Sequence, residues 1–192
     1  MEQARKPKAE IATIDCALIT IEVQGDEFPL GFDTANQIQV EPRIETQDAV
    51  TLIVKGILRA QKRGKTIITG HKITLTNNLF IPELVLIIQG GEIVYDAVNT
   101  DKIVGYNPPV AGSTEFGDTF TLNAYTAEYD SAGMIVKCEK ISYPNCQGEP
   151  MAFGSEDGVF RVTDYVITSA PKQGEHPYQI TYPGSLPEFV TA

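Results

Sequence analysis

The chain has 192 residues, of which 42% are hydrophobic, and its formal net charge at pH 7 is −10. This composition excludes a disordered chain, and the absence of an apolar run of about 20 residues excludes a membrane-spanning helix. Three cysteines, none in a CxxC pair, are too few for a disulfide framework, and the acidic surplus opposes binding to nucleic acid or anionic membranes. We therefore expect a soluble chain of ordinary domain length that folds in a reducing compartment.

The N-terminal segment is expected to be flexible over residues 1–10, which are polar and are not followed by the apolar region of a secretory signal. Residues 13–23 alternate between apolar and polar side chains with one irregularity. This pattern predicts a strand with one bulge or with two partly buried faces. A loop containing Gly25, Pro29 and Gly31 is expected to follow.

A long hairpin is predicted next. Its strands are marked by β-branched and other apolar residues at Ile38, Val40 and Ile44 and in the segments 50–54, 66–69 and 73–76. The polar segment 60–65 indicates the turn, so the tip is expected to hold Lys62, Arg63 and Lys65. We expect a hairpin of this length to project from the body.

The charges of the chain are distributed unevenly. Between Ala49 and Pro82 there is no Asp or Glu, whereas six basic residues fall there: Lys55, Arg59, Lys62, Arg63, Lys65 and Lys72. The rest of the chain holds nine basic and 25 acidic residues, so its net charge is −16. Opposite signs on different parts of one chain favour head-to-tail contact between copies, so the six are candidate inter-subunit contacts. A solvated hairpin with a chance basic run is the alternative.

A short helix is predicted over residues 82–89. Pro82 suits its first position, Glu83 suits the positive end of the helix dipole, and Gly90 suits its exit, although the run is also compatible with a buried strand. Further strands are expected at 92–95, 102–106, 119–129, 134–143, 159–169 and 178–182, with turns at 130–133 and 155–158. Together these elements predict a mainly β fold, a β-sandwich or barrel with one short flanking α-helix and a projecting β-hairpin.

Catalytic and metal-binding residues are not indicated by the histidines or the cysteines. Neither His71 nor His176 has a Ser, Cys or carboxylate at a spacing that suggests a triad, so surface or structural roles are expected. Cys16, Cys138 and Cys146 lack the spacing of zinc ligands, and we expect buried apolar thiols.

Nucleotide and sugar chemistry is not indicated either. No glycine-rich phosphate-binding motif occurs. The carboxylate pairs Glu128 with Asp130 and Glu156 with Asp157 are explained as turn residues. The sequence does not exclude that such a pair serves as the two catalytic carboxylates of a glycosidase. We therefore predict a non-enzymatic chain with no cofactor and no metal.

A series of short motifs runs through the C-terminal part of the chain. In order they are KITLTNNLFIPEL at 72–84, YNPP at 106–109, FTLNAY at 120–125, EYD at 128–130, YPNCQG at 143–148 and EDG at 156–158. This series resembles the tail tube proteins of long-tailed phages of Gram-positive hosts and of related phage-derived particles. The chain departs from that pattern at Ile81, a poor helix cap, and before Ala49, where no motif matches.

The resemblance implies one tail-tube-like domain over residues 1–192, with a C-terminal extension at 171–192 that holds one strand. It implies six copies in a ring and rings stacked into a tube in a virion tail, assembled from subunits made in the host cytoplasm. Partners would be further copies of the chain and sheath, baseplate and tape-measure proteins, while phage DNA passes through without specific binding. The acidic surplus suits an acidic lumen, because a wall that repels phosphate lets DNA slide.

Two alternatives of different kinds remain. A ligand- or carbohydrate-binding β-sandwich module of a surface or tail-tip protein would share the β-rich composition, but the absence of Trp counts against a sugar platform. Baseplate and tail-completion proteins are alternatives within the class of tail structural proteins.

Overall fold

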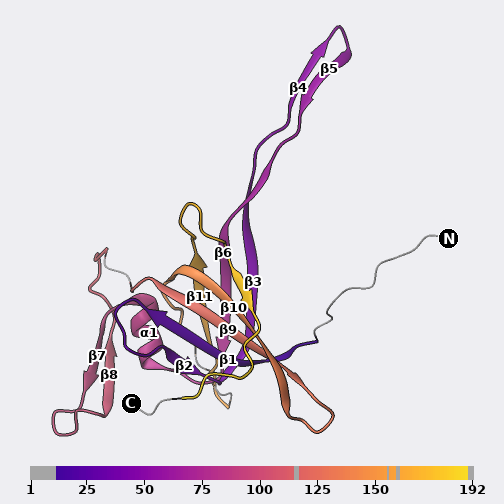
Figure 1. Ribbon diagram of the computed structural model, residues 1–192. Coiled ribbons are helices and arrows are strands. Elements are labelled where there is room, and N and C mark those ends of the chain that lie inside the picture. Colours follow the sequence, from indigo (N-terminus) through magenta and orange to yellow (C-terminus); the bar gives the residue numbers. More distant parts are fainter. Residues whose placement is uncertain (1–11, 115–116, 155, 159–160, 190–192) are drawn as a thin grey trace.

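The computed structural model describes residues 12–114, 117–154, 156–158 and 161–189. Its main element is a large antiparallel sheet with the strand order β2-β1-β9-β10-β11-β6-β3, and β12 pairs with β10 beside this path (Figure 1). The strands of this sheet are β1 (Ile14–Val23), β2 (Leu30–Phe32), β3 (Ala35–Thr46), β6 (Thr66–Asn77), β9 (Phe120–Tyr129), β10 (Ile135–Gly148), β11 (Thr163–Ser169) and β12 (Gln179–Thr181).

Two small hairpins and one short helix complete the described part of the chain. One hairpin joins β4 (Val50–Val54) to β5 (Ile57–Lys62), and the other joins β7 (Glu92–Tyr95) to β8 (Ile103–Asn107). The helix is α1 (Pro82–Gln89). The large sheet is curved, since β3 at one edge contacts β1 near the other. These elements confirm the prediction of a mainly β fold with a short helix and a projecting hairpin.

Alternation along the strands explains the core. In β11 the residues Thr163, Tyr165, Ile167 and Ser169 are buried and alternate with more exposed ones, as the period of two in a strand requires. The register places Tyr165 opposite Leu75 of β6 and Ile167 opposite Ile73, so two buried cross-strand pairs stack on one face. The core on this face is then closed by α1, through Leu84, Val85 and Ile88.

The segment 82–89 forms a helix and not a buried strand. Leu84, Val85 and Ile88 fall on one side of the helix, so a single apolar face is turned to the core. The helix ends at Gly90, whose N–H donates to the carbonyl oxygen of Leu86 and whose φ of 76° suits glycine. At Gly148 of β10, a Cβ atom would collide with the side chain and carbonyl of Ile88, so the glycine allows the close approach of helix and sheet.

Three expectations about the strands were wrong in detail. The loop expected around Gly25 to Gly31 contains β2, which is stabilised by pairing with β1 from Ile19 opposite Phe32 to Ile21 opposite Leu30. Strand β10 does not end at Tyr143 but continues to Gly148. The chain passes Pro144 through a register shift between Tyr143 and Cys146, because a bulge accommodates a proline within a strand.

The third correction concerns the start of the strand expected at 159–169, which begins at Thr163. Residues 159 and 160 lie outside the described residues, as do Ser155 of the expected turn 155–158 and the predicted flexible terminus 1–10. The turn expected at 130–133 is present between β9 and β10. There Asp130 accepts hydrogen bonds from the N–H groups of Ala132 and Met134, both at 2.8 Å.

Candidate assembly surfaces

The most exposed feature of the molecule is a two-stranded arm, residues 41–68, which projects from the large sheet (Figure 1). Every residue from 41 to 68 is exposed. The strands β3 and β6 pair as far as Thr46 opposite Thr66, the N–H of Gln47 donates to the carbonyl of Lys65 at 2.9 Å, and pairing resumes in β4 and β5. At about 3.3 Å per residue, the stretch 43–54 extends about 40 Å. An isolated two-stranded hairpin is marginally stable, so such an arm gains from contact with a partner.

The tip of the arm lies at Lys55 and Gly56, which connect β4 to β5. Both residues have positive φ, 51° and 76°, as the two-residue type I′ hairpin turn requires. The prediction that the turn lies at 60–65 was therefore wrong. Gly64, which suggested that turn, lies instead beside Gln47, where a Cβ atom would collide with the carbonyl oxygen of the facing strand.

Five of the six predicted contact residues belong to the arm. Lys55 is in the tip turn, Arg59 lies at the register shift of β5, Lys62 ends that strand, and Arg63 and Lys65 follow in the connection to β6. Among the described residues, none of these five forms an ion pair with a carboxylate. Among the described residues these five charges therefore have no ion-pair partner, although Glu41, Glu45 and Asp48 lie on the same arm.

Lys72, the sixth predicted contact residue, lies apart from the other five. It belongs to the part of β6 inside the large sheet, where the register places it opposite Glu41 of β3 and Thr168 of β11. The structure thus brings five of the basic residues together on the arm and leaves Lys72 on the body.

An apolar stripe on the arm tip was not predicted as a functional surface. Alternation places Val50, Leu52 and Val54 on one side of β4, and the register places Ile57 beside Val54. These four side chains are 67%, 55%, 42% and 55% exposed. We call them the apolar stripe. Contiguous exposed apolar side chains of this kind mark interaction surfaces, so the arm combines apolar contact area with positive charge.

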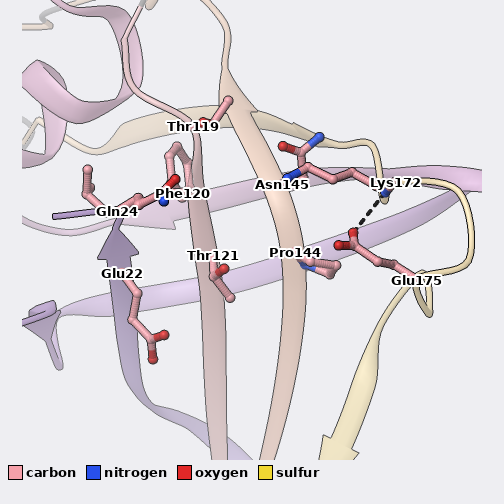
Figure 2. Close-up of a pocket in the computed structure, with 10 residues that line it drawn as sticks. Glu22, Gln24, Thr119, Phe120, Thr121, Pro144, Asn145, Lys172 and Glu175 are labelled. Atoms are coloured by element: carbon pink, nitrogen blue, oxygen red, sulfur yellow. Dashed lines mark hydrogen bonds between the residues drawn. The ribbon is translucent and has the colours of Figure 1, made fainter.

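A polar hollow lies where β1, β9 and β10 meet the loop that contains Lys172 and Glu175 (Figure 2). Its volume is about 340 Å³. The backbone N–H of Lys172 donates to Glu175 Oε2 at 2.9 Å. Glu22 accepts a hydrogen bond from Asn123 Nδ2 at 2.7 Å and lies 3.7 Å from Lys140 Nζ.

The lining of the polar hollow does not favour the ligand-binding alternative. Phe120 is its one aromatic side chain, and it is buried in the core and not presented as a stacking platform. The carboxylate of Glu22 is already paired. Hydrogen-bonding groups are present, but the hollow offers a sugar ring no flat apolar face.

The two histidines have different environments. His71, at the base of the arm, is buried, with ring centroids 5.3 Å from Tyr143 and 5.5 Å from Tyr178, both edge to face. Burial lowers the pKa of His71 below its ordinary value of 6.5 and raises the pKa of Tyr143 to about 12. His71 is a packing residue that joins the arm base to the C-terminal segment, whereas His176 is exposed.

The thiols are also packing groups. Cys138 and Cys146 are buried and free, and Cys16 is half-buried. Burial raises the pKa of Cys146 to about 12 and also raises that of Cys16. Within the described ranges, no three His, Cys, Asp or Glu side chains lie close enough to hold a metal ion, and no helix is long and apolar enough to span a bilayer.

No family model and no curated protein matches the chain. Among solved structures, it is similar to a chain of the PVC sheath-tube complex, an extracellular contractile injection system in the extended state. The identity is 12% and the TM-score 0.36, over 90% of this chain and 92% of that chain. It is also similar to a chain of the six-fold symmetrised baseplate of the anti-feeding prophage, at 10% identity and a TM-score of 0.32, over 94% and 98% of the two chains. At TM-scores below 0.5 these similarities do not assign a family, and function is inferred from the chain's own surfaces.

Proposed function

We propose that this chain is a non-enzymatic structural subunit that assembles with copies of itself into stacked hexameric rings, the tube of a phage-tail-like particle. The arm carries this proposal. In a single copy it exposes an apolar stripe and five positive charges that have no ion-pair partner among the described residues. Burial of such a surface is favourable, so a partner is expected to cover it.

A second copy of the chain is the partner that the charges favour. The arm, residues 41–68, holds six basic and three acidic residues, a net charge of +3, so the rest of the chain has a net charge of −13. A contact between the arm of one copy and the acidic body of the next uses two different surfaces. Such heterologous contacts either close into a ring or continue as a filament, and a tube of stacked rings uses both.

The number of copies and the role of the lumen follow from the resemblance to tail tube proteins. Six copies of one domain spanning residues 1–192 would form each ring, with sheath, baseplate and tape-measure proteins as further partners. The acidic surplus would keep DNA from adhering to the wall of the tube. In this proposal the chain supplies a conduit in a tail-like particle and no chemistry.

Electron microscopy of the purified chain tests the proposal. We expect rings or hollow tubes of uniform diameter in negative stain, at low and at physiological salt. A chain that stays monomeric at every concentration in both salts would contradict self-assembly and would favour the ligand-binding alternative, which a glycan screen then tests.

The role of the arm charges has its own test. Charge reversal by Lys62→Glu and Arg63→Glu lowers the sum of the five arm charges from +5 to +1. We expect the double variant to lose assembly at physiological salt, because attraction to an acidic surface is removed. The matched control reverses two basic residues away from the arm, Lys102→Glu and Lys172→Glu, and should assemble. Normal assembly of the Lys62 and Arg63 variant would rule out these two residues as contacts.

A further inference from the structure

A second exposed apolar surface lies on the body of the molecule, away from the arm tip. It is a groove of about 700 Å³ between β1, β2, the outward side of α1 and the C-terminal segment. Figure 1 shows α1, β2 and the C-terminal segment on the body, well away from the β4–β5 tip at the end of the arm. Its apolar lining includes Leu18, Phe28, Leu30, Leu86, Ile87 and Phe189. We call this surface the apolar groove.

The walls of the apolar groove are uncovered in a single copy. Leu18 is 3% exposed, but Phe28 and Phe189 on the walls remain 57% and 60% exposed. The ring of Phe189 lies over Gly31, where a Cβ atom would be 3.2 Å from it. Two large aromatic side chains therefore flank an apolar hollow with more than half of their surface in water, the arrangement expected of an anchor pocket at an interface.

The rim of the groove is acidic. Asp26, Glu83 and Glu188 line it, and none of the described lining residues is Lys or Arg. The arm tip has the complementary character, since the apolar stripe is accompanied by Lys55 in the turn and by Arg59 in β5. An apolar centre with charges around it is the usual anatomy of a specific interface.

We propose that the apolar groove receives the arm tip of a neighbouring copy, with the apolar stripe between Phe28 and Phe189 and the basic residues against the acidic rim. This inference rests on the proposed self-assembly and names the surface to which the arm binds. Because the groove lies on the body, well away from the tip, the arm of a copy does not fill the groove of the same copy. Each copy offers one tip and one groove, so the contact is heterologous and can link many copies in series, either around a ring or from ring to ring.

A single substitution in the groove gives the first test. Phe28→Lys removes one aromatic wall and places a positive charge opposite the basic tip. We expect the critical concentration for assembly to rise about tenfold or more, the effect of removing a central anchor side chain. The control is Val98→Lys, the same change of charge at a 96% exposed apolar residue outside the groove. Pelleting measures assembly, and thermal melting confirms that both variants fold.

A charge exchange between the two surfaces gives the decisive test. Reversing the tip with Lys55→Glu and Arg59→Glu, or the rim with Asp26→Lys and Glu188→Lys, should each impair assembly. Combining both pairs in one chain should restore it, because opposite charges again face each other. Failure of the combination to restore assembly would exclude the tip as the occupant of the groove.

Different outcomes contradict the groove inference and the proposed self-assembly. If the wild-type chain assembles and the Phe28→Lys variant has the same critical concentration, the groove inference is overturned and the proposed function stands. A wild-type chain that never assembles would overturn the proposed function itself.

Discussion

The apolar stripe should contribute to assembly and not to folding, and the double variant Leu52→Thr with Ile57→Thr separates the two. Threonine is β-branched, which suits a strand, and it has less apolar surface than leucine or isoleucine. Both side chains are 55% exposed, so about half of each remains to be buried by a partner. Full burial of such a side chain contributes about 1.5–3 kcal/mol, so the pair would contribute roughly 2–3 kcal/mol at an interface.

The expected loss is therefore about 1.5–2.5 kcal/mol once the methyl groups retained by threonine are subtracted, a rise in critical concentration of about tenfold to seventyfold. The unfolding free energy of the monomer should change by no more than about 0.5 kcal/mol, because the stripe packs against little in its own chain. Pelleting measures the critical concentration, and denaturant unfolding measures the unfolding free energy of the monomer. The matched control is Val98→Thr with Val110→Thr, at sites 96% and 81% exposed. Unchanged assembly, or a monomer destabilised by several kcal/mol, would refute the reasoning.

Three further predictions concern the body of the molecule. Ile88→Ala, at a fully buried position where α1 meets the core, should lower the unfolding free energy by about 2–5 kcal/mol in a denaturant titration, and a smaller loss than 1 kcal/mol would contradict the packing described. The pKa of His71 is below 6.5 in the folded chain, so at acidic pH the unfolded chain binds more protons than the folded chain. The free energy of unfolding should therefore be highest above about pH 7 and decline below 6.5. His71→Phe should flatten that decline in unfolding curves between pH 7 and 5, and an unchanged slope would assign the pH dependence to other groups. Cys146, with a pKa of about 12, should resist iodoacetamide at pH 8 in the folded chain and react once guanidinium unfolds it, as peptide mass mapping can show.

Much of the fold could be predicted because its signals are local. Alternation with a period of two marked most strands, and Pro82 and Gly90 marked the two ends of the helix. The missed strand β2 has only three residues and contains Gly31, so it has no pattern of its own and depends on pairing with β1. The tip turn was misplaced because the basic segment around Gly64 has the composition of a turn, whereas the positive φ angles fall at Lys55 and Gly56.

The candidate surfaces were also predicted only in part from the sequence. The segregation of basic residues between Ala49 and Pro82 is a property of the sequence alone, and it indicated the arm as a contact element. The apolar run Val50–Val54 has the composition of a buried core strand, and nothing in it distinguishes a covered strand from an exposed one.

By itself, then, the sequence determined the β class, the helix and the sign of charge on each part, because these depend on neighbours along the chain. Only the tertiary structure decided that the arm is left exposed by the rest of the described chain, and that residues 18–31, 83–87 and 187–189 meet to form a groove. Exposure and convergence depend on contacts between segments far apart in sequence, which no local pattern encodes.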